Sequence, residues 1–306
     1  MVAPSGEQHE ITGGGYRAVV TEAGASLRLL EHEGRPLVLG WEEDAASRSG
    51  RGQLLAPWPN RIRDGRYTFG GQDLQLALTE PARHNASHGL VRWAAWSLEE
   101  HTDHSVSLVL RVMSQTGYPW TLDLHALYDL SADGLTVTVT ATNLAGSPAP
   151  YALGAHPYLT TGRGPVDAWE LTLPCDTRLV VDEQMIPTGR ESVDGTELDF
   201  RVSRPIRDLS MDTGFTGLTR GESGRAEVVV RDPRSGDGTL LWLDRHHRWV
   251  QVYTGDDLPA LVRESLAVEP MTAPPNAFAT GEDLVVLAPA GSEGDEHSAS
   301  WGIRAV

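Results

Sequence analysis

The segment that decides the fold is residues 135–142, LTVTVTAT. Leu135, Val137, Val139 and Ala141 alternate with four threonines. Successive side chains of an extended chain point to opposite faces, so one face of this segment can pack against apolar neighbours while the other meets water. The alternation therefore predicts a half-buried β-strand.

Similar short segments recur over nearly the whole chain. They are rich in Val, Thr, Leu and Trp and are bounded by Gly, Asp, Asn and Pro, as strands require. They are 105–113 (SVSLVLRVM), 226–231 (AEVVVR), 239–244 (TLLWLD), 249–254 (WVQVYT), 284–288 (LVVLA) and a last short strand at 301–306 (WGIRAV). The acidic segment 291–300 (GSEGDEHSAS) is expected to be a solvated loop before that last strand.

The remaining sequence favours an all-β protein. The 32 Gly and 19 Pro leave few windows for a long helix, so we expect only short helices. No low-complexity linker divides the chain. We therefore predict one domain over residues 1–306, a large antiparallel β-sandwich of two packed sheets, with its function on loops or on the concave face of one sheet.

Composition excludes several functions. The 306 residues include 25 Lys+Arg and 42 Asp+Glu, a net charge of −17, which disfavours nucleic acid or an anionic membrane as a partner. The single cysteine cannot form an intrachain disulfide or a thiolate metal site. The N-terminus resembles no signal peptide, and no run of about 18 apolar residues occurs, so we expect a cytoplasmic protein.

Histidine pairs could suggest a metal site, but none is predicted. His101, His104, His246 and His247 have no helical or strand frame that would make imidazoles converge with a third ligand. These four are expected in surface loops, and neither a metal nor a cofactor is predicted.

Two early segments carry more polar character than turns need. Residues 57–71 present Asn60 and Arg61 from a turn stiffened by prolines. For Arg61 a surface ion pair is an equally good interpretation. Residues 85–93 place His88 beside Gly89, which lets another group approach closely. A purely structural histidine is again a fair rival.

Two later segments place titratable groups at strand ends. In residues 153–159 a proline follows His156, biases it toward an extended backbone and so favours a fixed ring direction. In residues 266–278, Glu269 follows three apolar residues and ends a predicted hydrophobic strand. An unpaired buried carboxylate is costly, so Glu269 is either buried against a partner or held for chemistry.

Taken together, these segments resemble the aldose 1-epimerase (mutarotase) family. The motifs that carry the resemblance occur in the family's order and are Asn60-Arg61-Ile62, His88-Gly89, Gly154-x-His156-Pro157-Tyr158, Gln251-Val-Tyr253-Thr254-Gly255, Glu269-Pro270 and Leu287-x-Pro289. The resemblance implies a galactose-mutarotase-like β-sandwich without a metal, which interconverts the α and β anomers of an aldose.

The resemblance also implies residue roles. His156 matches the general acid and Glu269 the general base. Arg61, His88, Asp212 and Gln251 match sugar-binding positions. Asn60 is added as a further hydrogen-bonding group, and Trp58, Tyr158 or Phe215 could supply the flat apolar surface that a sugar ring needs.

The chemistry of anomer exchange requires such residue types. Opening a hemiacetal needs one proton delivered to the ring oxygen and one removed from the anomeric hydroxyl, and reclosure after rotation gives the other anomer. A histidine titrates near neutral pH, and a partly desolvated carboxylate gains basicity. One acid and one base are sufficient.

Alternatives remain open at this level. The substrate could be a hexose 6-phosphate or a sulfonated hexose, with Arg83 or Arg92 as an anion clamp, although surface solvation is the simpler interpretation of both. A glycoside hydrolase could recruit Asp212 with Glu269 as its two carboxylates. A non-catalytic carbohydrate-binding β-sandwich would need no acid–base pair. The expected partner is a small aldose, and the expected assembly is a monomer or homodimer.

Overall fold

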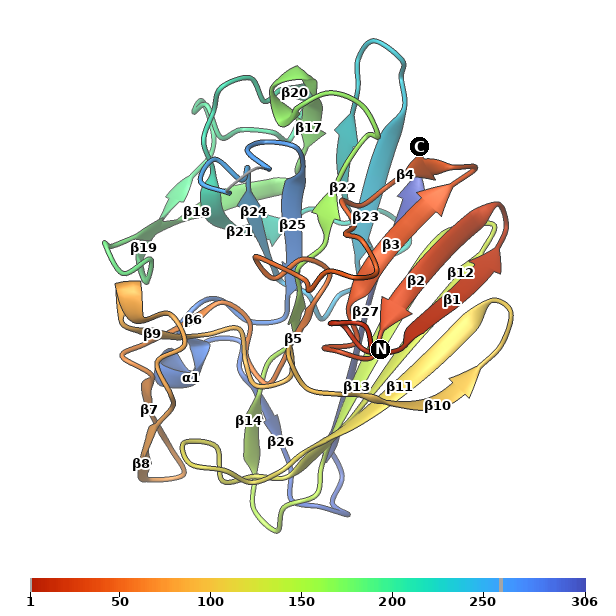
Figure 1. Ribbon diagram of the computed structural model, residues 1–306. Helices are drawn as coiled ribbons and strands as arrows, with labels where there is room; N and C mark the ends of the chain where they lie inside the picture. The colour runs from red at the N-terminus through yellow and green to blue at the C-terminus, as the bar shows by residue number, and fades with distance from the viewer. Residues whose placement is uncertain (1, 259–260) are drawn as a thin grey trace.

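The computed structural model describes residues 2–258 and 261–306, and nearly all regular structure in it is β-strand. Figure 1 shows two large sheets with a smaller sheet at the side of one of them. All strand pairs of the two large sheets are antiparallel. No helix among these residues is long and apolar enough to cross a membrane.

The larger sheet has nine strands and contains most of the predicted ones. In spatial order they are β10 (Ser97–His101), β11 (Ser105–Val112), β12 (Leu122–Ser131), β13 (Gly134–Asn143), β27 (Glu296–Ala305), β23 (Gly238–Leu243), β22 (Ala226–Arg231), β17 (Glu170–Thr172) and β20 (Arg204–Pro205). In β13 the residues Leu135, Val137, Val139 and Ala141 are buried, which confirms the alternation.

Strand β27 corrects the prediction of a solvated loop over residues 291–300. It begins at Glu296, inside that segment, and pairs edge to edge with β13, whose threonines form a polar face. There Thr138 and Ser300 share a hydrogen bond of 2.8 Å between their hydroxyls, and Thr140 donates to Ser298 at 3.1 Å. Cross-strand hydroxyl pairs stabilise a sheet face that meets water, so the polar composition that suggested a loop belongs to the outer face of a strand.

The second large sheet has eight strands, and the candidate site lies on it. Seven follow one another in the order β19 (Pro187–Ser192), β18 (Cys175–Val181), β21 (Asp212–Leu218), β24 (Trp249–Tyr253), β25 (Leu266–Met271), β15 (Gly154–Ala155) and β5 (Leu54–Leu55), and β16 (Tyr158–Leu159) also pairs with β25. Gln251 lies opposite Gly214 on one side and Glu269 on the other.

The remaining elements complete the molecule. The four-stranded sheet holds β1 (Gln8–Gly13), β2 (Tyr16–Thr21), β3 (Leu27–His32) and β4 (Arg35–Pro36), and it packs beside β11 and β12. Three two-stranded pairs are β6 (Arg61–Arg63) with β9 (Asn85–Ser87), β7 (Arg66–Phe69) with β8 (Gln72–Gln75), and β14 (Ala149–Tyr151) with β26 (Val285–Leu287). The helical segments are α1 (Ala277–Thr280) and two 3-10 turns, Pro81–Arg83 and Val166–Ala168.

The main apolar core joins the two large sheets. It contains Val137 of β13 together with Val250 and Val252 of β24 and Val268 of β25. Because side chains alternate along a strand, Gln251 and Glu269 must point to the opposite face of the eight-stranded sheet. The all-β sandwich predicted from the sequence is therefore confirmed, and burial of Val250, Val252 and Val268 fixes the face on which the polar residues lie.

Candidate active site

His156 and Glu269 lie directly opposite each other. Strand β25 pairs with Gly154 through Met271 and with Tyr158 through Ala267, so the register places residue 156 opposite residue 269. His156 Nε2 lies 3.3 Å from Glu269 Oε1. Both side chains are buried, so the pair is shielded from bulk water.

Gln251 and Asp212 extend this site across the sheet. Gln251 is on β24, next to Glu269, and Asp212 begins β21. The Gln251 amide donates to Asp212 Oδ1 at 2.6 Å. This bond fixes the amide orientation and directs Gln251 Oε1 away from Asp212. The Asp212 side chain is 33% exposed, against 12% for the neighbouring Arg61.

Arg61 and Asn60 reach the same place from β6 and the turn before it. Arg61 Nη2 lies 3.9 Å from Asp212 Oδ2, and its Nη1 donates to Asn60 Oδ1 at 3.4 Å. A tighter pair joins Arg61 Nε to Glu80 Oε2 at 2.8 Å. Arg61 is therefore largely buried and held from three sides, which excludes the interpretation of it as a surface ion pair.

His88 stands at the edge of the His156 ring. The two ring centroids are 5.5 Å apart with planes at 66°, and the His88 amide donates to the Asn60 carbonyl at 2.8 Å. Gly89 has a φ of +71°, and a Cβ there would collide with the Ala56 carbonyl. The close approach predicted for this glycine is confirmed.

Burial shifts the pKa values of the two facing groups in opposite directions. Loss of solvent lowers the pKa of His156 to about 3 and raises the pKa of Glu269 well above its usual range. The Asp212 carboxylate raises the pKa of Glu269 further, whereas Arg61 opposes that rise. Burial also lowers the pKa of His88, with a smaller contribution from His156. Burial therefore favours the uncharged form of both groups, an imidazole and a carboxylic acid.

A loop that the sequence analysis did not single out shapes the site behind His156. Gly50 has a φ of +77°, and a Cβ on it would lie 2.7 Å from His156 Cδ2. The backbone of His156 pairs with this loop as well, since its N–H donates to Gln53 and its carbonyl accepts from Gly52, both at 3.0 Å. In the sequence this loop shows only the turn dipeptide Ser49-Gly50, and the same dipeptide occurs at turns elsewhere.

The aromatic residues are placed differently from the expectation. Trp58 and Phe215 belong to the main core, and Trp58 packs on Phe278 with centroids 5.5 Å apart. Tyr158 is stacked on His156 at 4.9 Å and 10°, and its hydroxyl donates to the Ser49 carbonyl at 2.9 Å. Of the three candidates, Tyr158 therefore supports the imidazole of His156.

His247 also differs from the expectation of a surface loop. Its side chain is fully buried and its Nδ1 lies 2.9 Å from Asp244 Oδ1. The carboxylate replaces the hydrogen bond to water that the imidazole loses on burial. His104 and His246 lie in loops and are at least partly exposed, as predicted, whereas His101 is exposed but ends strand β10.

Arg83 and Arg92 differ in their surroundings. Arg83 Nη1 donates to Glu80 Oε1 at 3.0 Å. The Arg92 guanidinium is partly buried and lies 5.6 Å from the Trp93 ring centroid. It donates no hydrogen bond to an acceptor in the described part of the chain. The Arg92 carbonyl accepts from Gln53 Nε2 at 2.8 Å, and the Gln53 carbonyl accepts from the His156 N–H, so Arg92 lies near the site. Its charge lowers the pKa values of both His88 and His156.

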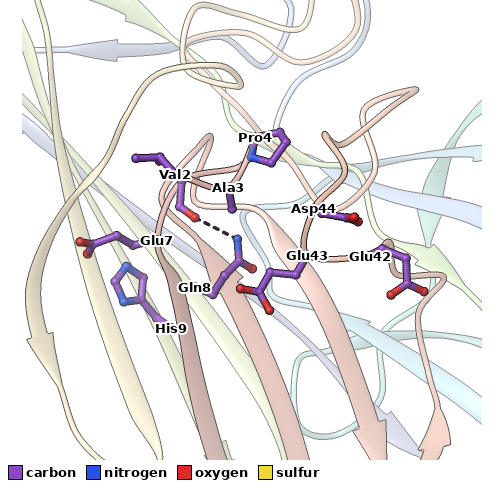
Figure 2. Close-up of a pocket in the computed structure, with 10 residues that line it drawn as sticks. Val2, Ala3, Pro4, Glu7, Gln8, His9, Glu42, Glu43 and Asp44 are labelled. Atoms are coloured by element: carbon purple, nitrogen blue, oxygen red, sulfur yellow. Dashed lines mark hydrogen bonds between the residues drawn. The ribbon is translucent and has the colours of Figure 1, made fainter.

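A wide surface cavity lies elsewhere. It has a volume of about 1040 Å³ and is lined by the N-terminal segment and the loop after β4. Figure 2 shows the carboxylates of Glu42, Glu43 and Asp44 on one side of it and Glu7 and His9 on the other. None of the seven predicted site residues lines this cavity, and the geometry around His156 and Glu269 is the better guide to chemistry.

Comparison with known proteins identifies the family. The family model described as aldose 1-epimerase matches residues 7–298. The uncharacterized protein YihR of Escherichia coli strain K12 is 36% identical over 284 residues, covering 92% of this chain and 89% of the relative. Galactose mutarotase of Bos taurus is 27% identical over 259 residues, covering 78% and 73%. The chain belongs to the aldose 1-epimerase family.

Solved structures show the same fold. A GalM/aldose epimerase homologue from C. elegans aligns with a TM-score of 0.86 at 21% identity and covers 98% of each chain. A galactose 1-epimerase from Lactobacillus acidophilus aligns with a TM-score of 0.80 at 20% identity, covering 96% of this chain and 92% of that one. The galactose-mutarotase-like fold is confirmed, and with the family it confirms an isomerase that interconverts aldose anomers.

Proposed function

We propose that His156 and Glu269 are the acid and base that exchange the anomers of a hexose or related aldose. The single observation that carries this assignment is the 3.3 Å contact between His156 Nε2 and Glu269 Oε1. Two groups that touch each other can both reach one O–C–O unit when a sugar enters between them. Each proton transfer of this kind is typically worth about 10² to 10⁴ in rate.

The pair needs one proton in total. To open the ring, protonated His156 donates to the ring oxygen and the Glu269 carboxylate takes the proton of the anomeric hydroxyl. The products are a neutral imidazole and a carboxylic acid, which are the forms that burial favours. Before the closed ring enters between them, the proton moves from Glu269 Oε1 to His156 Nε2 across their contact. Reclosure then runs both transfers in reverse.

The surrounding polar groups provide hydrogen bonds to the sugar. Arg61, with its guanidinium fixed by Glu80, and the Oε1 of Gln251 are a donor and an acceptor with set directions. Asp212 is the most exposed acceptor. Glu269 Oε2 and His88 Nδ1 have no hydrogen-bond partner among the described residues. We assign sugar binding to Asn60, Arg61, His88, Asp212 and Gln251.

Polarimetry on freshly dissolved α-anomers tests this proposal. Glucose, galactose, a hexose 6-phosphate and a sulfonated hexose form the panel. Faster decay of optical rotation than in buffer for one of them supports the function. Spontaneous rates with all four, together with binding of a sugar, would instead support the non-catalytic alternative.

One observation favours an anionic hexose as a second candidate substrate. Arg92 lies near His88 and His156 with N–H donors that no described residue accepts, whereas Arg83 is already paired with Glu80. A phosphate or sulfonate would accept from such a guanidinium. The variant Arg92→Gln should then raise KM for the anionic sugar alone. Equal effects on neutral and anionic sugars would reject this candidate.

We further propose a cytoplasmic location and a monomeric or homodimeric state. The lone Cys175 is a buried free thiol, which suits a reducing compartment. Sedimentation of the purified protein measures its assembly, and cell fractionation its location.

A further inference from the structure

A carboxylate outside the sequence motifs holds Arg61. Arg61 Nε donates to Glu80 Oε2 at 2.8 Å, and Arg61 Nη2 donates to Glu80 Oε1 at 3.2 Å. The two side chains are 12% and 19% exposed. Two parallel hydrogen bonds fix the plane of a guanidinium as well as its position, so Glu80 determines how Arg61 meets the sugar.

Glu80 is itself fixed without help from Arg61. Its backbone N–H donates to the Asn85 carbonyl at 3.0 Å, and the Asn85 N–H donates back at 3.1 Å. The Asn85 side chain also donates to Glu80 Oε2 at 3.3 Å. Asn85 begins β9, whose partner β6 carries Arg61. The short loop of residues 80–85 therefore places the Glu80 carboxylate beside the Arg61 guanidinium before any sugar binds.

Glu80 also balances the charge near the acid–base pair. The positive charge of Arg61 lowers the pKa values of both His156 and Glu269. The carboxylate of Glu80 offsets part of that charge. The other charged and titratable groups that act on the pair come from β21, β16 and the segment after β9, and they are Asp212, Tyr158, His88 and Arg92.

We propose that Glu80 is a positioning residue for anomer exchange, holding the Arg61 guanidinium in its sugar-binding orientation and offsetting its charge beside His156 and Glu269. The inference rests on the proposed function, because it assumes that Arg61 binds the sugar. Glu80 acts through Arg61 and does not itself touch the reacting atoms.

The test is the variant Glu80→Gln with a matched control. Asp123 and Arg111 form a similar two-bonded pair at 2.6 and 2.7 Å, but on an exposed strand face far from the site motifs. We expect Glu80→Gln to lower kcat/KM about tenfold or more, mainly by raising KM. The whole pH profile should also move to lower pH, because the positive charge of Arg61, no longer offset by Glu80, lowers the pKa values of His156 and Glu269 further. Asp123→Asn should change neither quantity.

A double-mutant cycle separates positioning from a merely structural role. If Glu80 acts through Arg61, then Glu80→Gln should have little further effect in an Arg61→Lys background. Should Glu80→Gln fail to fold, Glu80→Asp keeps the charge and withdraws the carboxylate, so KM should rise while the pH profile stays in place.

Three outcomes would overturn the inference. They are a wild-type KM and pH profile in Glu80→Gln, a wild-type KM in Glu80→Asp, and an undiminished loss from Glu80→Gln in the Arg61→Lys background. Absence of mutarotation by the wild-type protein is a different result, because it removes the proposed function before Glu80 is tested.

Discussion

His156 Nε2 lies 3.3 Å from Glu269 Oε1, and the register of β25 on both sides of His156 sets this contact. Strand β25 pairs with the residues before and after the His156-Pro157 step, so the imidazole is held by backbone on either side. The acid–base geometry is therefore set by strand pairing. Substitution of either side chain should remove the activity and leave the sheet folded.

The variants His156→Asn and Glu269→Gln should each lose about two to four orders of magnitude in turnover, because each removes one of the two proton transfers. Polarimetry measures the loss, and circular dichroism checks the fold. His247→Asn is a matched control, since His247 is a buried histidine paired with a carboxylate outside the site. Near-normal turnover in either folded site variant contradicts the assignment.

The pH dependence of kcat/KM should be bell-shaped and unusually wide. Below the lowered pKa of His156, about 3, both groups carry a proton and no base remains. Above the raised pKa of Glu269 both groups have lost their protons and no acid remains. Activity should thus persist well below pH 6.5. An acidic limb near pH 6.5, as for an exposed histidine, would count against a desolvated pair.

Glu269→Gln should stabilise the fold at high pH while it abolishes turnover. The folded-state pKa of Glu269 is raised above its usual 4.5, so its contribution is fully present below pH 4.5 and is lost as pH rises through the folded pKa. The glutamine variant does not suffer this loss. At pH 8 we expect Tm to increase by about 2–4 °C, the effect of roughly 1 kcal/mol. Parallel Tm-versus-pH curves for the two proteins would refute this.

Gly50→Ala should impair turnover by displacing the His156 ring, because the added Cβ would lie 2.7 Å from Cδ2. Gly34→Ala is the matched control. Gly34 has a φ of +78°, against +77° for Gly50, and a Cβ there meets nothing within 4 Å. Both variants carry the same backbone strain, so their difference in kcat isolates the contact. Equal kcat values would mean that the ring is not positioned by residue 50.

The fold was predictable where one sheet face is apolar and the other polar. Segment 226–231 coincides with β22, and segment 135–142 lies within β13. Strand β27 was predicted too short, because the polar side chains Ser298 and Ser300 pair with threonines across the sheet. A polar outer strand face has the composition of a loop, and only its partner distinguishes the two.

The site was predictable from motifs as a set of residues but not as an arrangement. The structure brings all seven predicted residues to one face around β24 and β25. Their roles and the single-domain organisation remain predictions. Glu80 and Gly50 could not be found from the sequence, since they act through Arg61 and His156 and lie in segments without a motif. Such residues become visible only when distant segments meet.

Strand β27 joins two groups of strands that have no other hydrogen-bonded connection within the nine-stranded sheet, β10 to β13 on one side and β23 to β20 on the other. During synthesis both groups leave the ribosome long before residues 296–305 do. Until then, β13 and β23 each present an unpaired edge. The order of synthesis therefore leaves two strand edges open to pairing with other chains until residues 296–305 are made.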